Sequence, residues 1–175
     1  MTAHFFLDET KQRGCSLAVV SLAPTAVRPA RAALRNLVLP GQRRLHMKSE
    51  RDSRRRLIVS AMVELEVQAV VVDAGRRYGT DLERRDRCLR AVVAHAKNNE
   101  ATTLVIESDE TLIHHDRQLL YAETRAQGYE RLRYEHRRPF EELLLALPDA
   151  VAWCWAKGGE SRRRVESVVS DVIEV

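Results

Sequence analysis

The pattern of apolar and polar positions predicts two strands followed by two helices in the first third of the chain. Strands are expected over "AHFFLDE" (3–9) and "CSLAVVSL" (15–22), with "KQRG" as the turn between them. So short a connection favours an antiparallel hairpin. Apolar residues then recur at helical spacing from Pro24 to "LPG" (39–41), and again along one face between Leu57 and Leu65.

Strands and helices alternate in the rest of the chain. The pattern predicts a strand at 67–74 ("VQAVVVDA"), a helix at 82–96, a strand at 102–110 ("TTLVIESDE"), a helix from 112 to about 128, a short edge strand at 131–136 ("RLRYEH"), a helix over "FEELLLALPDAVAWCWAKGG" with Pro148 in its first turn, and a last amphipathic helix with a stripe of Val165, Val168, Val169, Val172 and Ile173. This order indicates a mixed sheet with helices packed on both of its faces. We expect one domain over residues 1–175, with a basic helical insertion at about 24–65.

The basic segment "QRRLHMKSERDSRRR" (42–56) lies within that insertion. It has only Leu45 and Met47 as apolar anchors. Because it has little to bury, we expect it to be the most mobile part of the chain and to become ordered if it binds a substrate.

Composition excludes some classes of protein. Hydrophobic residues make up 45% of the 175 residues, which argues against disorder. Cys15, Cys88 and Cys154 form no CxxC pair, and they fit buried thiols in a reducing cytoplasm. The start of the chain does not resemble a signal peptide, and no apolar stretch is long enough to span a membrane. We therefore expect a cytoplasmic protein.

The positive charge comes mostly from arginine. The net charge of +4 is a weak sign of nucleic-acid binding, and arginine codons are common in GC-rich genomes. The clustering adds to the picture, because neighbouring arginines can contact phosphates. The candidate nucleic-acid contacts in the basic segment are Arg43, Arg44, Arg54, Arg55 and Arg56.

Carboxylates follow two of the predicted strands. Asp8 and Glu9 end the first strand, Glu107 and Asp109 end the strand at 102–110, and Asp149 lies in an otherwise apolar helix. If the two strands pair in parallel, their carboxyl ends are neighbours, and ligands of α/β sheets bind at such ends. Three converging carboxylates would suit Mg²⁺ or Mn²⁺.

Each acid also has a structural explanation. Asp109 could cap the helix that follows it, Asp149 could complement a helix N-terminus, and Asp73 reads as a strand-end residue. The sequence alone leaves both explanations open.

Other candidates are weaker. His46 and Lys48 could contact phosphate or assist proton transfer, or belong to an ordinary basic loop. Asp116 could face the acidic pocket or pair at the surface with Arg117. The adjacent His114 and His115 do not have the spacing of zinc ligands. Trp153 and Trp155 read as packing residues, although one could stack on a base.

The segments "FFLDETK", "LHMKSERD", "LVIESDE" and "ALPDAVAWCW" occur in an order that resembles the bacterial family known as domain of unknown function 3800. The resemblance covers nearly the whole chain, although each motif is short. It implies a ribonuclease H-like fold, with Asp8, Glu107 and Asp149 at the positions of the family's acidic residues. The sequence departs from the pattern at Thr10, where serine is usual, and at Pro148, where alanine is usual.

The resemblance leads to two hypotheses. The first is a metal-dependent nuclease with Asp8, Glu107 and Asp149 as catalytic metal ligands, and with Glu9, Asp109, Asp116, His46 and Lys48 as supporting residues. The second is a non-catalytic nucleic-acid-binding or regulatory module of a mobile-element or defence system on the same fold. RNA and DNA are both open as partners, and the valine stripe leaves a homodimer open.

Overall fold

The chain folds around one mixed sheet. The computed structural model describes residues 2–175, and their elements run in the order β1 (Ala3–Thr10), β2 (Cys15–Leu22), α1 (Pro24–Arg35), η1 (Met47–Ser49), α2 (Asp52–Glu64), β3 (Gln68–Gly75), α3 (Asp81–Asn98), β4 (Ala101–Glu107), α4 (Ile113–Ala126), β5 (Arg133–Arg137), η2 (Leu143–Leu145), α5 (Ala146–Lys157), α6 (Gly159–Val165) and β6 (Val169–Glu174), where η1 and η2 are 3-10 helices. The strand order in the sheet is β5-β4-β1-β2-β3-β6. The predicted α/β class is confirmed.

The strand pairings confirm the predicted hairpin. β1 is antiparallel to β2 and β2 is antiparallel to β3, whereas β4 runs parallel to β1 and β5 parallel to β4. Gly14 turns the chain in the hairpin with φ +107°, and a Cβ added there would lie 1.9 Å from the backbone oxygen of Gly75. A side chain at position 14 would therefore both strain the turn and collide with β3.

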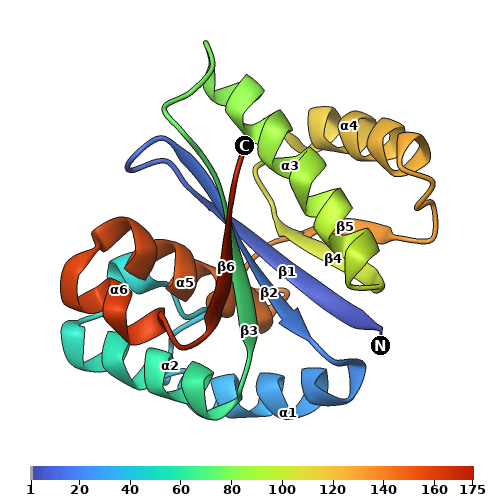
Figure 1. Cartoon of the computed structure of the whole chain (residues 1–175). Coiled ribbons are helices and arrows are strands. Elements are labelled where there is room, and N and C mark those ends of the chain that lie inside the picture. Colours follow the sequence, from blue (N-terminus) through green and yellow to red (C-terminus); the bar gives the residue numbers. More distant parts are fainter. Residues whose placement is uncertain (1) are drawn as a thin grey trace.

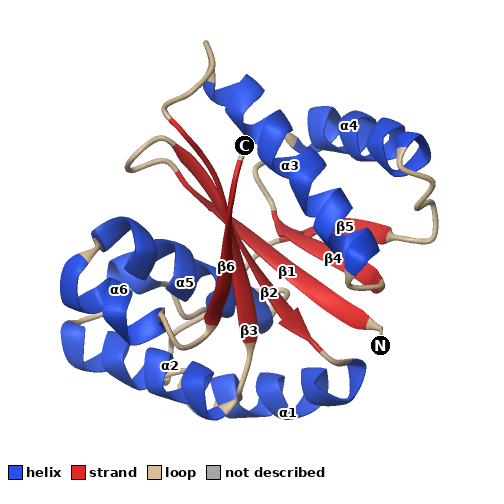
Figure 2. Cartoon of the chain, in the orientation of Figure 1, coloured by secondary structure: helices blue, strands red, loops and turns tan. Residues whose placement is uncertain are grey.

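Helices cover both faces of the sheet, as expected. In Figure 1, α3 and α4 lie on one side of the strands, and α1, α2, α5 and α6 lie on the other. Figure 2 shows the strands as the layer between these two groups. Within the described part of the chain, no helix is both long and apolar enough to cross a membrane.

The alternation of side chains along each strand supplies two cores. Phe6, Val20 and Val71 pack under the group that includes α5, whereas Phe5 and Leu17 pack under α3. Because strand side chains alternate between faces, both cores come from the same strands. The three cysteines are free and buried, as predicted.

The predicted C-terminal helix is wrong. A short helix, α6, ends at Val165, and residues 169–174 form β6, which pairs in parallel with β3 at the edge of the sheet. The valine stripe fits a helix by spacing, but β-branched residues lose rotamer freedom in helices and pack well in strands. The edge of β3 offers backbone hydrogen-bond partners, and pairing with them favours a strand over a helix.

The predicted helix over 140–159 begins later than expected. Residues 143–145 form η2, and α5 starts at Ala146, with Pro148 in its first turn as predicted. Glu142 caps η2 by accepting a hydrogen bond from the Leu144 N–H at 3.0 Å. α1 and α2 lie between β2 and β3, in the segment expected as an insertion.

Candidate functional site

Two of the predicted acids lie side by side at the carboxyl ends of neighbouring strands. The parallel register pairs Leu7 with Ile106, so Asp8 and Glu107 come next on β1 and β4. Phe6 and Val105, two residues earlier on each strand, both face the core under α5. Because side chains alternate, Asp8 and Glu107 point to that same face. The predicted adjacency of the two strand ends is confirmed.

The third acid reaches this place from α5. Asp149 lies in the first turn of that helix, and its carboxylate is close enough to raise the pKa of both Asp8 and Glu107. The helix packs by Ala150 and Val151 on the core below. The structure therefore brings the three predicted carboxylates together.

All three carboxyl groups are harder to ionise than usual. Burial raises the pKa of Asp8 well above its ordinary value, and the charges of Glu107 and Asp149 raise it further. Burial, followed by the charge of Asp149, raises the pKa of Glu107. Burial raises the pKa of Asp149 to about 6. Burial accounts for the direction at all three carboxyl groups, and neighbouring like charges add to it at Asp8 and Glu107.

Two of the acids have partners in the basic segment. The backbone N–H of Met47 donates to Asp149 Oδ2 at 2.7 Å, and His46 Nε2 lies 3.9 Å from Asp149 Oδ1. Arg44 Nη1 lies 3.9 Å from Glu107 Oε1. Asp8 accepts the backbone N–H of Glu9 at 2.7 Å. The basic segment thus packs against the acids, and its own Leu45 and Met47 are buried.

The donor set suits a hard divalent cation, although it is not assembled as a coordination sphere. Within residues 2–175, no group of three or more His, Cys, Asp or Glu side chains is arranged to hold a metal ion. The three carboxylates turn instead toward the partners just described. Their oxygens are nevertheless the ligands that Mg²⁺ and Mn²⁺ prefer, and a cation between them would offset their repulsion.

A cavity opens at the ends of β1 and β4. Its volume is about 380 Å³, and its lining includes Asp8, Glu9, Glu107, Asp109 and Arg85. Asp8 and Glu107 thus lie beside a space large enough for a small ligand group, whereas Asp149 is not among the residues that line it. Asp109 itself holds the turn before α4, accepting the N–H of Thr111 at 3.0 Å, and does not cap α4, whose N-cap residue is Leu112.

Glu9 belongs to a different cluster on the opposite face of the sheet. Arg85 Nη1 donates to Glu9 Oε2 at 2.8 Å, and the same guanidinium binds Asp116 through two bonds of 2.9 and 2.8 Å. His136 Nε2 lies 2.9 Å from Asp116 Oδ2. Asp116 is therefore neither in the acidic pocket nor at the surface, the two positions considered for it, but fully buried in an ion pair.

Sequence reasoning counted Arg85 only among the clustered arginines that could contact phosphates, and it missed the buried ion-pair roles of Arg85 and His136. Arg85 lies on the apolar face of α3, four residues before Leu89. A charged residue at an apolar position of the helical pattern could have indicated a buried ion pair. Burial opposes ionisation of Asp116, but bonds from Arg85 and His136 outweigh it and lower the pKa of Asp116 to about 2. The cluster fixes Glu9, and with it the end of β1.

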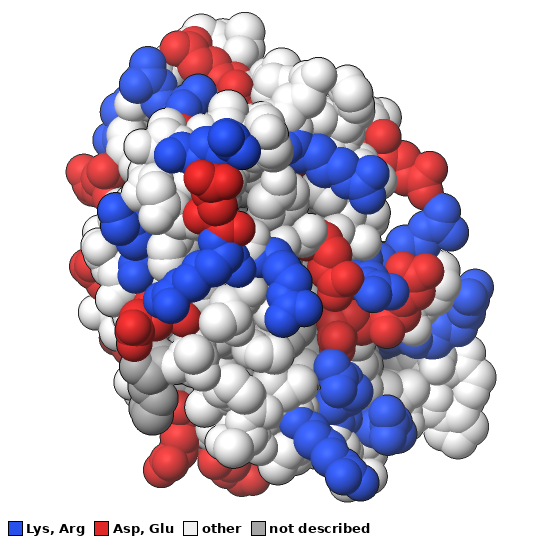
Figure 3. Space-filling view, turned by 90° about the vertical axis from the view of Figure 1, so that its right-hand side faces the viewer, with Lys and Arg blue, Asp and Glu red and all other residues white. Residues whose placement is uncertain are grey.

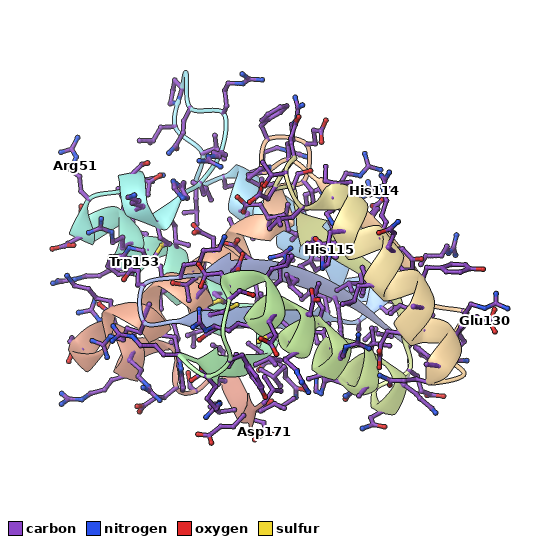
Figure 4. The ribbon with its side chains drawn as sticks, turned by 90° about the horizontal axis from the view of Figure 1, so that it is seen from above. Arg51, His114, His115, Glu130, Trp153 and Asp171 are labelled. Carbon is purple, nitrogen blue, oxygen red and sulfur yellow. The ribbon has the colours of Figure 1, made fainter. Side chains whose placement is uncertain are left out.

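The remaining candidates are spread over the surface. His115 pairs with Asp86 at 2.7 Å, and Figure 4 shows His114 and His115 on α4, away from Trp153. Asp73 accepts the hydroxyl of Ser16 and the N–H of Gly75, both at 2.8 Å, as a strand-end residue would. The side chain of Lys48 is exposed beside His46.

The predicted phosphate-binding arginines differ in their surroundings. Arg43 stacks on Phe140 with 4.4 Å between the guanidinium carbon and the ring centroid. Arg54 bonds to the backbone oxygen of Leu37 and to Glu50. These two are held by neighbours, whereas Arg44 faces the acids.

The comparisons with known proteins agree with the geometry at the level of the fold. No model of a known protein family matches the chain, and no curated protein matches it in sequence. Among solved structures, the chain is similar to RNase HII from Archaeoglobus fulgidus in its complex with PCNA, with TM-score 0.57 and 16% identity over 95% of this chain and 75% of that one. The fold is ribonuclease H-like, as predicted.

Proposed function

We propose that the protein is a metal-dependent hydrolase of phosphodiester bonds in nucleic acid. The observation that carries this proposal is the convergence of Asp8, Glu107 and Asp149 at the carboxyl ends of two parallel strands in a ribonuclease H-like fold. Three raised carboxyl pKa values in one place are more typical of a functional site than of a helix cap or a turn. Membership of the domain of unknown function 3800 family, which the sequence resemblance at these three positions suggests, is part of the same proposal.

The three carboxylates would hold Mg²⁺ or Mn²⁺. Such an ion supplies an activated water and stabilises charge on the leaving oxygen. Asp8 and Glu107 are fixed by the sheet, and Asp149 is fixed by α5 and by the Met47 N–H. Residues on two rigid layers keep the donor set in place.

Basic side chains around the acids complete the site. Burial and the charge of Arg44 lower the pKa of His46, which favours the neutral imidazole that can accept a proton. Arg44 lies next to Glu107 and would attract the substrate phosphate. The free cysteines suit a reducing cytoplasm.

The test is a cleavage assay with matched variants. Labelled single-stranded RNA, single-stranded DNA and an RNA–DNA hybrid are incubated with Mg²⁺, Mn²⁺ or EDTA. Asp8→Asn, Glu107→Gln and Asp149→Asn should each lower the rate about 100-fold or more, because each removes part of the charge stabilisation. Asp171→Asn is the control, since Asp171 is exposed on β6 and lies away from α4 and Trp153 in Figure 4.

A non-catalytic nucleic-acid-binding or regulatory module remains the alternative. The observation in its favour is that Glu107 and Asp149 already have partners in Arg44 and Met47. Binding without cleavage under every metal condition would support the module and overturn the hydrolase. Cleavage that survives in all three acid variants would show that hydrolysis occurs elsewhere or comes from a contaminant.

A further inference from the structure

A second pocket lies between α2, α5 and α6. Its volume is about 250 Å³, and its lining includes Arg55, Arg56, Trp153, Lys157 and Arg164. Asp52 and Glu160 also line it. Four cations therefore face two carboxylates across a small space.

The two carboxylates of this pocket are already paired. Arg55 Nη1 bonds to Asp52 Oδ1 at 2.7 Å, and Arg164 Nε lies 3.5 Å from Glu160 Oε1. Among the described residues, neither the side chain of Arg56 nor that of Lys157 makes a hydrogen bond or an ion pair, and both are exposed. Two positive charges are thus left without a partner at the rim.

One wall of the pocket is rigid. Arg55 Nε donates to the backbone oxygen of Met47 at 2.8 Å, and its guanidinium carbon lies 4.5 Å from the centroid of the Trp153 ring. In Figure 4, Trp153 lies by α2, on the side of the molecule where Arg51 projects outward. The stack holds Arg55 and Trp153 in fixed positions for a ligand.

The pocket continues from the acidic centre along α5. Asp149 and Trp153 are four residues apart on this helix, and Lys157 follows four residues later. With a rise of 1.5 Å per residue, their Cα atoms lie about 6 and 12 Å beyond Asp149. Met47 joins the two places directly, because it lines the pocket and donates its N–H to Asp149.

Charge on the α3 and α4 side of the molecule is arranged differently. Figure 3 shows basic side chains interspersed with acidic ones on the face that lies to the right in Figure 1. Several of these cations are paired, including Arg90 with Glu123 and Arg125 with Glu130. A polyanion gains little from cations that are already neutralised.

We propose that the pocket between α2, α5 and α6 binds the phosphodiester backbone of a single nucleic-acid strand, next to the acidic centre. Arg56 and Lys157 contact the phosphates, and Trp153 with its stacked Arg55 forms the wall against which the strand lies. This subsite rests on the proposed function in one respect. It is the place where a strand bound at the hydrolytic centre would leave that centre.

The experiment measures binding without cleavage. Fluorescein-labelled oligothymidylate and oligouridylate are titrated in EDTA at several salt concentrations, by fluorescence anisotropy. Arg56→Ala/Lys157→Ala should weaken binding, and the slope of log affinity against log salt should become shallower by about 1.4, or about 0.7 per lost phosphate contact. The control is Arg28→Ala/Arg133→Ala, which removes the same charge from exposed positions near the opposite end of the sheet.

A second readout locates the strand. Trp153 and Trp155 are the two tryptophans of the chain, so Trp155→Phe leaves Trp153 as the sole reporter. Unlabelled oligonucleotide should quench its fluorescence, and Arg56→Ala/Lys157→Ala should shift the quenching to higher concentrations. Thermal melting of Arg56→Ala/Lys157→Ala should match that of the wild type, since the side chain of neither cation has a partner to lose.

The outcomes separate this subsite from the hydrolase itself. Equal weakening by the two double variants, or no quenching of Trp153, would overturn the subsite. If Asp8→Asn abolishes cleavage while Arg56→Ala/Lys157→Ala binds like the wild type, the hydrolase stands and the subsite falls. If no variant or metal gives cleavage but the binding losses occur as expected, the subsite stands and the hydrolase falls.

Discussion

Two adjacent carboxylates at the end of β1 have different roles because a strand alternates its side chains. Asp8 points to the α5 side and joins Glu107 and Asp149, whereas Glu9 points to the α3 side and bonds to Arg85. One of the two therefore lies among like charges and the other is neutralised. This arrangement explains how an apolar strand can end in two acids without a large penalty for both.

Asp149 provides a prediction at this scale that depends on pH. Its pKa is raised from 3.8 to about 6 in the folded protein, so the folded state binds the extra proton between these values. Without metal, the contribution of Asp149 therefore lowers the free energy of unfolding as pH rises from about 4 to 6. The loss reaches about 3 kcal/mol at pH 7, at about 1.4 kcal/mol for each pKa unit.

Asp149→Asn should remove this loss. The amide oxygen can still accept the Met47 N–H, so the variant should be about 3 kcal/mol more stable than the wild type at pH 7 in EDTA, with the difference vanishing near pH 3. Urea unfolding across this range measures it, with Asp171→Asn as a matched control. A variant that is less stable at pH 7 would show that the carboxylate is needed structurally.

Individual residues were predictable where the pattern placed them at strand ends. Asp8 and Glu107 follow apolar runs, so their positions at one edge of the sheet follow from parallel pairing alone. Arg85 and His136 were not predictable in the same way, because their roles depend on Asp116, which comes from a third element. The bidentate bond between Arg85 and Asp116 exists only once α3 and α4 pack together.

At the scale of elements, the pattern of apolar residues was sufficient to predict the strands that are buried on both faces of the sheet. β1, β2, β3 and β4 are continuous apolar runs and were predicted close to their observed bounds. The segment at 165–175 was not predictable by period, because a valine stripe fits both a helix and an edge strand. Pairing with β3, more than 90 residues earlier in the chain, decides the outcome.

Because residues 169–174 form a strand, the neighbouring residues Val172 and Ile173 are expected to contribute unequally to stability, which a helix would not predict. Ile173 packs on the core that contains Val70 and Val72, whereas its neighbour Val172 is 37% exposed. Ile173→Ala should lower the free energy of unfolding by about 1–2 kcal/mol, and Val172→Ala by less than about 0.5 kcal/mol. Guanidinium unfolding of the two variants measures this. Equal effects would be expected from the helical stripe, in which both residues share one face.

At the scale of the whole molecule, the sheet divides the protein into two layers with different tasks. The α3 and α4 layer neutralises its buried charges internally, through Arg85, Asp116 and His136. The layer on the other face leaves three carboxylates in mutual repulsion and docks the basic segment on them. The mobility expected for residues 42–56 stays a prediction, although their contacts with Asp149 and the core tie them to the site.

This division predicts that a divalent cation stabilises the whole fold. The three carboxylates assemble only in the folded state, so Mg²⁺ that binds them raises the free energy of unfolding by about 2.7 kcal/mol at 100 times its Kd. For a chain of 175 residues this corresponds to a rise in Tm of about 5–10 °C.

Asp8→Asn should abolish the effect of Mg²⁺ on Tm, because it removes a ligand from the centre. The metal-free variant should melt at the same temperature as the wild type or higher, since burial and the charges of Glu107 and Asp149 already disfavour an ionised Asp8. One thermal-shift series with both proteins, with and without Mg²⁺, gives the answer. If Asp8 only stabilises the end of β1, the variant melts lower without metal, and Mg²⁺ changes neither protein. A metal ligand and a structural carboxylate predict different Tm values for the metal-free variant relative to the wild type. They also differ in whether Mg²⁺ raises the Tm of the wild type, so the same measurement separates the two roles.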